Sequence, residues 1–177
     1  MTQTILYIAA SVDGYIAGPN GEIDWLSLVD REGEDYGYDA FYASVDAIVS
    51  GSKTYELAAS FGQWPYPGKP TFVFTRRPLK SDRDDVFFLS EEVDSAMEKI
   101  KAQGFQRVWL LGGGELVRSF LQHGLIDEYI ISTIPVVLGA GIQLFPPPVP
   151  EQRLELISSR QYESGLVQVH YRNRQSQ

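Results

Sequence analysis

Acidic and phenolic side chains in the first quarter of the sequence are candidates for moving a proton or orienting a small ring. They are Asp13, Asp35, Asp39, Tyr38 and Tyr42. Carboxylates and phenols exchange protons when they lie within hydrogen-bond reach of a reacting group. Each acid also has a structural interpretation, because Asp13 precedes a glycine in a pair typical of turns, and Asp35 and Asp39 fit solvated positions on an acidic helix. The sequence leaves both interpretations open.

Glycine-rich or polar turns follow three apolar segments, "AIVSGSKT", "TFVFTRR" and "WLLGGGE". In open α/β sheets, ligands bind beyond the carboxyl ends of strands, where helix N-termini present unpaired N–H groups to anions. These turns therefore indicate a phosphate-bearing ligand, with Gly112, Gly113 and Gly114 allowing the backbone to approach it closely. The alternative is that the three glycines only permit a tight turn and close packing of the helix on the strand.

Several better-known motifs are absent from the sequence. A dinucleotide fingerprint starting at Gly112 requires glycine or alanine where Val117 stands, and in "GSKT" Ser52 separates Gly51 from Lys53, unlike in a P-loop. The two histidines, His123 and His170, have no partner at helical spacing, so we expect no metal site. No G-x-S-x-G elbow of a serine hydrolase is present.

The composition is that of one globular α/β domain, which we expect to span residues 1–177. Hydrophobic residues make up 44% of the chain and charged residues 21%, so the chain can bury a core. The net charge of -8 argues against nucleic acid or an anionic membrane as partner. No apolar run approaches the ~20 residues of a membrane span, no signal peptide is evident, and there are no cysteines. We expect a cytoplasmic protein.

Continuous apolar runs predict the strands of a sheet that is covered on both faces. They are Ile5–Ala10, Ala47–Ser50, Thr71–Thr75, Val86–Leu89, Val108–Leu111 and Tyr129–Ile134. Helices are expected between them, at Asp35–Ser44, Ser52–Ser60, Glu91–Ala102 and from Leu116 to near Gly124. The segments Leu154–Tyr162 and Leu166–Tyr171, joined at Ser164-Gly165, are expected to form an antiparallel hairpin added to the sheet.

Five segments in this order resemble the dihydrofolate reductase-like superfamily. They are "IAASVDGYIAG", "GSKTYE", "TFVFTRR", "LLGGGELVRSFL" and "IDEYIISTIPVVLGAGIQLF". The chain is most similar to the branch that contains the C-terminal reductase domain of bifunctional riboflavin-biosynthesis proteins, over about residues 4–172. The resemblance implies a three-layer α/β fold, with a mixed, mostly parallel central sheet, helices on both faces and the C-terminal hairpin.

The resemblance also implies NADPH as cofactor and assigns residues to it. The glycine run would hold the pyrophosphate, "GSKT" and the arginines after the next strand would hold the adenosine end with its 2′-phosphate, and the first strand would line the nicotinamide pocket. The residues concerned are Ala10, Ile16, Gly51, Ser52, Lys53, Thr54, Thr75, Arg76, Arg77, Leu111, Gly112, Gly113, Gly114, Glu115 and Leu116.

On the substrate side, the resemblance implies a carboxylate next to a small heterocycle, which is Asp39 or Asp35. Tyr42 is a further catalytic candidate because its phenol could donate a proton. Expected substrate contacts are Asp13, Trp25, Tyr38, Trp64 and Tyr66. Trp25, Trp64 and Tyr66 could form a wall that stacks on the substrate, and they also fit an aromatic core. The chain departs from the family pattern at Ser52, which replaces an arginine, at Lys69, which stands beyond "PYPG" where dihydrofolate reductases use arginine, and at Tyr7, where riboflavin-pathway reductases often have lysine.

The expected activity is therefore an NADPH-dependent reduction of a small heterocycle, either a phosphoribosylamino-pyrimidine or a pterin. The alternative is a nucleotide-binding module of the same fold without catalysis. Related riboflavin-pathway reductases pair through their sheets, and the apolar alternation of "LVQVHY" after Pro150 offers an edge for pairing. We therefore expect a homodimer.

Overall fold

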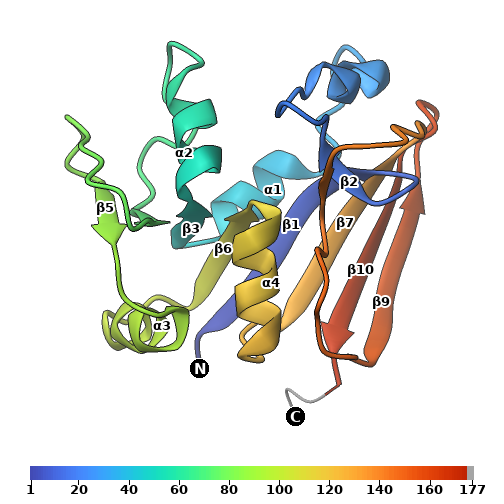
Figure 1. The fold of residues 1–177 in the computed structure, drawn as a ribbon. Coiled ribbons are helices and arrows are strands. Elements are labelled where there is room, and N and C mark those ends of the chain that lie inside the picture. Colours follow the sequence, from blue (N-terminus) through green and yellow to red (C-terminus); the bar gives the residue numbers. More distant parts are fainter. Residues whose placement is uncertain (175–177) are drawn as a thin grey trace.

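The structure is a computed structural model in which residues 1–174 are described. Within this part of the chain, a sheet of eight strands has the order β5-β4-β3-β6-β1-β7-β10-β9. Its strands are β1 (Gln3–Ser11), β3 (Ala47–Gly51), β4 (Thr71–Phe74), β5 (Val86–Leu89), β6 (Arg107–Gly112), β7 (Glu128–Ile134), β9 (Leu154–Gln161) and β10 (Val167–Asn173). All pairs from β5 to β7 are parallel, and β10 and β9 add an antiparallel hairpin at one edge (Figure 1). The predicted mixed sheet with its C-terminal hairpin is confirmed.

Helices cover both faces of the parallel part of the sheet. They are α1 (Tyr38–Ser44), α2 (Ser52–Ala59), α3 (Val93–Ala102) and α4 (Gly114–Gln122). Because successive strand residues point to opposite faces, Ile5 packs with Phe41 of α1, whereas Leu6 packs with α3 and α4. Both faces are therefore apolar, and this explains why the strands read as continuous hydrophobic runs.

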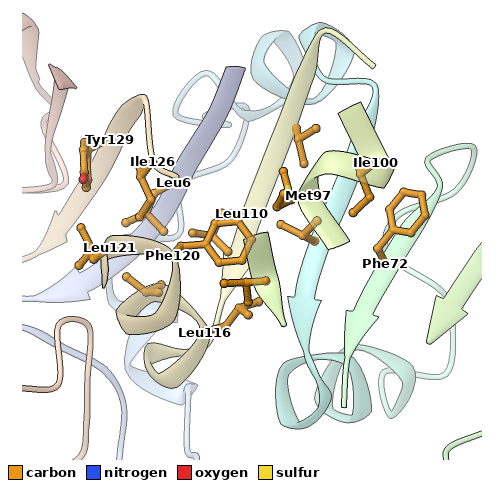
Figure 2. Close-up of a cluster of buried hydrophobic side chains, with 14 of the residues drawn as sticks. Leu6, Phe72, Met97, Ile100, Leu110, Leu116, Phe120, Leu121, Ile126 and Tyr129 are labelled. Carbon is orange, nitrogen blue, oxygen red and sulfur yellow. The ribbon is translucent and has the colours of Figure 1, made fainter. Parts of the chain in front are cut away.

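The largest buried cluster lies between the sheet and the pair α3 and α4. Figure 2 shows Leu110 of β6 next to Leu116 and Phe120 of α4, with Met97 and Ile100 of α3 beside them. The side chains of Leu110, Phe120 and Met97 are fully buried. Each such side chain stabilises the fold by about 1.5–3 kcal/mol relative to an exposed position. This packing fixes the helix that starts directly after the glycine run.

Three short elements were not predicted. Strand β2 (Tyr15–Ala17) pairs with β8 (Ile142–Gln143) in a separate two-stranded sheet, and a 3-10 helix, η1, spans Asp24–Val29. A three-residue strand and a two-residue strand are too short to show a periodic pattern. The helices α1 and α3 also begin later than predicted, at Tyr38 and Val93.

The glycine run ends where the segment that carries β8 crosses the start of α4. A Cβ atom on Gly114 would lie 2.2 Å from the carbonyl oxygen of Gln143, so a side chain cannot fit there. Gly112 has a φ angle of +115°, which residues with a Cβ rarely adopt. The steric part of the alternative stated from the sequence, a tight turn and close packing that need glycine, therefore holds for Gly112 and Gly114. Gly113 has ordinary space around its Cβ position and a negative φ angle.

We expect Gly114→Ala to lower the free energy of unfolding by about 1–3 kcal/mol, because the new methyl group forces two backbone segments apart. Gly113→Ala is the matched control, and its stability should be close to that of the unchanged protein. Urea denaturation followed by circular dichroism would measure both. Equal midpoints for Gly114→Ala and the unchanged protein would show that the crossing segment can move away without cost.

Candidate functional site

Two of the turns that the sequence indicated for phosphate binding contact each other. A Cβ atom on Gly51, at the end of β3, would lie 3.6 Å from the backbone of both Gly112 and Gly113. The hydroxyl oxygen of Thr54 lies 3.4 Å from the Cβ position of Gly113. Strand β4 pairs with β3, so the third turn, after Phe74, lies at the same edge of the sheet. The predicted neighbourhood of the three turns is confirmed.

The start of α4 has the features of an anion site. No side chain caps this helix, and its first intrahelical acceptor, the carbonyl of Gly113, bonds to the amide of Val117. The amides of the first turn therefore remain available, and the helix dipole favours a negative charge there. A cavity of about 460 Å³ opens at this end, lined by Tyr15, Gly114, Glu115, Ala140, Gly141, Ile142, Gln143 and Pro146. The carboxylate of Glu115 is engaged by Arg118. The group of Glu115 that can face a ligand is therefore its backbone amide.

The three cations expected at this edge differ in availability. Arg77 donates two hydrogen bonds to the carboxylate of Glu56, at 3.1 and 2.7 Å, and this pair raises the pKa of Arg77. Arg76 has only a 3.9 Å contact with Glu92, and both side chains are largely exposed. Lys53 has no ion pair within residues 1–174. Lys53 and Arg76 are thus the cations that remain free to contact a phosphate.

The small and aliphatic residues assigned to the nicotinamide pocket lie around the carboxyl end of β1. Ala10 is buried in the α4 cluster, and Ile16 packs against that cluster and reaches to 3.9 Å from the Cβ position of Gly113. On the opposite face, Ala9 belongs to the cluster that holds Trp25 of η1. The end of β1 is therefore lined by apolar groups on both sides, within reach of the glycine run.

Asp13, predicted to contact a substrate, has a structural role instead. Its carboxylate accepts hydrogen bonds from the Ser11 hydroxyl at 2.6 Å and from the amides of Leu138 and Gly139 at 3.0 and 2.7 Å. These hydrogen bonds lower the pKa of Asp13 to about 2, and the bond from the Ser11 hydroxyl has the largest effect. Asp13 fixes the loop that leads into β8, so the turn interpretation given by the sequence is the correct one.

The three catalytic candidates differ in whether their side chains are already engaged in hydrogen bonds. The carboxylate of Asp35 accepts hydrogen bonds from the amides of Asp39 and Gly37, which lower its pKa and hold the start of α1. The Tyr42 hydroxyl donates to the carbonyl of Pro67 at 2.8 Å, and burial raises its pKa to about 12. Asp39 is exposed and has no hydrogen bond from its side chain within the described residues. Asp39 is therefore the acid with a free carboxylate.

The aromatic residues expected to form a single substrate wall lie in different clusters. Trp64 packs with Tyr55, Val73 and Val86 under α2, and its ring is covered by Arg83 at 5.3 Å. Tyr66 and Tyr38 instead pack around Trp109 on the face of α1. Trp64 and Tyr66 nevertheless touch, with ring centroids 5.4 Å apart and the indole N–H of Trp64 donating to the carbonyl of Tyr66 at 3.0 Å. The ring of Trp25 lies apart from them, in the cluster of η1.

Sequence reasoning missed the role of Tyr7, which it noted only as a departure from the family. Tyr7 follows Ile5 on the α1 face of β1, and its phenol interacts with the side chain of Gln168 on β10. Burial raises the pKa of Tyr7 to about 12. The sequence gave no signal for this contact, because Gln168 is about 160 residues away from Tyr7. The two side chains meet only because β1 and β10 belong to the same sheet.

Two features are absent from residues 1–174. No group of three or more His, Cys, Asp or Glu side chains in this range could hold a metal ion. None of the described helices has the length and apolar character needed to cross a bilayer.

Comparison with known proteins gives a consistent result. The family model described as the RibD C-terminal domain matches residues 3–168. The uncharacterized protein YwjB of Bacillus subtilis (strain 168) is 41% identical over 170 residues, which cover 96% of this chain and 97% of that protein. YyaP of the same organism is 31% identical, with coverage of 96% and 94%.

Solved structures share the fold over nearly the whole chain. A putative riboflavin biosynthesis protein from Shewanella sp. PV-4 has a TM-score of 0.90 at 32% identity, covering 97% of this chain and 99% of that one. Acinetobacter baumannii RibD has a TM-score of 0.78 at 18% identity, and the match covers 98% of this chain but 58% of RibD. The chain therefore belongs to the family of RibD C-terminal domains and has their dihydrofolate reductase-like fold.

Proposed function

We propose that this protein is an NADPH-dependent reductase of a small heterocyclic substrate, a pyrimidine or a pterin. The observation that carries the proposal is the start of α4, where unpaired amides, a cavity of about 460 Å³ and the turn at Gly51 meet at one edge of the sheet. A pyrophosphate requires this combination of backbone donors and close access. Membership of a family of reductase-like domains supports the same conclusion.

The residues present fit NADPH in three places. The amides of Gly114, Glu115 and Leu116 would bind the pyrophosphate, with Thr54 beside them. Lys53 and Arg76 would bind the 2′-phosphate. The apolar end of β1 would exclude water from the nicotinamide, which supplies a hydride when the cofactor is bound.

The chain itself must then orient the substrate and supply one proton. Asp39 is our candidate for this role, because Asp35 is engaged in holding α1 and the Tyr42 hydroxyl is engaged by Pro67. The same observation favours one alternative, a nucleotide-binding protein without turnover, because a single exposed carboxylate is a weakly positioned proton donor. Steady oxidation of NADPH with a heterocycle supports the reductase, and tight binding of NADPH without oxidation supports the alternative.

We also propose that the protein forms a homodimer through the C-terminal hairpin. Strand β9 is the edge strand of the sheet, and its residues are exposed along nearly the whole strand, including Leu156 at 56% and Ile157 at 40%. An unblocked apolar edge strand favours pairing with another chain. Light scattering at tens of micromolar protein should give twice the monomer mass of 19.9 kDa. A monomer mass would contradict this proposal.

Removing the free cations should change the choice of cofactor. The double variant Lys53→Ala with Arg76→Ala should lose most of its preference for NADPH, since each lost charge-assisted bond costs about 1.5–3 kcal/mol, or at least roughly tenfold in affinity. NADH affinity should stay the same, because NADH lacks the 2′-phosphate. Titration of both cofactors by tryptophan fluorescence measures this preference.

Arg77→Ala is the matched control for that experiment, because Arg77 is already paired with Glu56 and should contribute little to cofactor choice. Equal affinity of the unchanged protein for NADH and NADPH, or an unaltered preference in the double variant, would reject the assigned 2′-phosphate site. Neither result would affect the pyrophosphate site at α4.

Asp39→Asn should reduce turnover by roughly a hundredfold while leaving NADPH affinity unchanged, because the amide cannot donate a proton as an acid does. Asp35→Asn serves as control, since asparagine can still hold the helix start. Steady-state kinetics and a separate NADPH titration distinguish the two effects. If both variants keep full activity, the proton comes from elsewhere, such as water, and the assignment on this helix is wrong.

A further inference from the structure

A polar hollow on the C-terminal hairpin lies apart from the cavity at the start of α4. It has a volume of about 240 Å³ and is lined by Ser158, Ser159, Arg160, Gln168 and His170 of β9 and β10. These strands form one edge of the sheet, and β7 and β1 separate them from β6, whose end carries the glycine run (Figure 1). The hollow is therefore a second concave site, and none of its lining residues is assigned to the cofactor.

The strand register brings four polar side chains to one face of the hairpin. Ser158 pairs with His170, and Arg160 pairs with Gln168. Residues directly opposite each other in an antiparallel pair point to the same face, with their Cβ atoms about 4.5–5.5 Å apart. Ser159 lies between the two pairs, so its side chain points to the other face. A guanidinium and a hydroxyl from β9 thus face an amide and an imidazole from β10.

The guanidinium of Arg160 is free to bind a ligand. The residue is exposed, and its side chain has neither an ion pair nor a hydrogen bond within residues 1–174. By contrast, Arg77, Arg83 and Arg118 each donate to a carboxylate. A guanidinium has five N–H donors in a planar fork that matches the oxygen atoms of an anion. All of these donors remain available at the hollow.

The imidazole of His170 is held in place by a buried acid. Its Nε2 atom lies 3.0 Å from Oε2 of Glu128 on β7, and the Glu128 side chain is only 7% exposed. This contact fixes the ring and leaves Nδ1 as the ring nitrogen that can contact a ligand. In the imidazolium form Nδ1 donates a hydrogen bond, and an anion bound beside it would favour that form.

The charges around the hollow favour an anion. None of the lining residues is acidic. Glu128 lies on the other side of the His170 ring, and Glu155 pairs with Arg172 at the next level of the same face. With His170 protonated, the cations on this face of β7, β10 and β9 are Arg160, Arg172 and His170, against the carboxylates of Glu128 and Glu155. A bound anion would therefore meet a net positive surrounding, although the whole chain carries a charge of -8.

The size and the donors of the hollow define the class of ligand. Sites for drug-sized molecules have volumes of about 300–1,000 Å³, so this hollow suits a smaller group. A tetrahedral oxyanion can accept from the guanidinium of Arg160 on one side and from Ser158 and His170 on the other. A carboxylate has two oxygen atoms in one plane and would leave some of these donors without a partner.

We propose that the hollow on β9 and β10 binds a tetrahedral oxyanion through Arg160, Ser158 and His170. The ligand is a phosphate, either as the free ion or as the end of a larger molecule. This site goes beyond the proposed reductase function and does not depend on it. It is also compatible with the proposed dimer, because pairing of edge strands uses backbone groups in the plane of the sheet, whereas the hollow lies on a face of the hairpin.

Nuclear magnetic resonance of the imidazole nitrogens tests the site directly, because the chain has two histidines. His123, at the end of α4, has Nδ1 next to the carbonyl of Ser119 and is an internal control. The probe is potassium sulfate at about pH 6, where a histidine is largely protonated. Sulfate should shift the ring signals of His170 with half-saturation at about 1 mM or lower, and leave those of His123 unchanged.

Potassium chloride at the same ionic strength should have no such effect. An unchanged His170 signal would show that Arg160 is engaged in solution, by a second copy or otherwise, and would overturn the proposal. Equal shifts of His123 and His170, or equal effects of chloride and sulfate, would overturn it as well, because they would report general screening of charge.

Paired variants identify the residues that bind the anion. Arg160→Gln should weaken sulfate binding at least roughly tenfold, because it removes a charge-assisted hydrogen bond. Arg153→Gln is the matched control: Arg153 is exposed, lies just before β9 and does not line the hollow. Ser158→Ala should weaken binding several-fold, whereas Ser159→Ala should not. Circular dichroism would check that all four variants are folded.

Equal sulfate affinity in Arg160→Gln and Arg153→Gln would overturn the proposal, because it would show attraction by net charge alone. Methyl phosphate and inorganic phosphate distinguish the two sources of the ligand. Equal or tighter binding of methyl phosphate would identify the end of a larger molecule, and weaker binding would identify the free ion. Acetate bound as tightly as sulfate would overturn the assignment to a tetrahedral anion.

Titration with NADP⁺ separates this site from the proposed cofactor site. NADP⁺ should leave the His170 signals unchanged, since two strands lie between the hairpin and β6. A shift of His170 on addition of NADP⁺ that disappears in Arg160→Gln would make the hollow part of the cofactor site and overturn the proposal. Absence of any NADP⁺ binding would remove the proposed reductase function, while the response of His170 to sulfate would still decide the oxyanion site.

Discussion

The close contact between the turns after β3 and β6 is the constraint on which the candidate site depends. A Cβ atom on Gly51 would already be in van der Waals contact with the backbone of Gly112 and Gly113. This contact exists because β3 and β6 are parallel neighbours and end at the same edge of the sheet. The buried residues of α3 and α4 hold both strands in that register, so the core determines the geometry of the turns.

The segment around β8 adds a second constraint on the same place. It crosses α4 at Gly114, pairs with β2, and is fixed by the carboxylate of Asp13, which binds the amides of Leu138 and Gly139. These contacts form one wall of the cavity at the helix N-terminus. The wall consists of residues far from the glycine run in sequence, and the pairing with β2 and the Asp13 carboxylate together hold it in position.

Charge is distributed unevenly across this edge, against a net charge of -8. Lys53 and Arg76 lie beyond β3 and β4, whereas Asp35 and Asp39 lie at the start of α1. Because parallel strands place their following turns in strand order, the basic and acidic groups are separated by the glycine run. The two cations underlie our proposal for where the 2′-phosphate of the cofactor binds.

The sequence alone determined the fold class, the parallel strands, the C-terminal hairpin and the glycine turn, because hydrophobic periodicity and turn residues are local signals. It also identified Lys53 and Arg76, since those cations follow predicted strands directly. Only the tertiary structure assigned Asp13 and Asp35 to backbone hydrogen bonds, paired Arg77 with Glu56, packed Trp64 between Tyr55 and Tyr66, and brought Gln168 of β10 to Tyr7 of β1. The reason is physical: whether a polar side chain is free or engaged depends on partners that packing brings together, and several of those partners are distant in sequence.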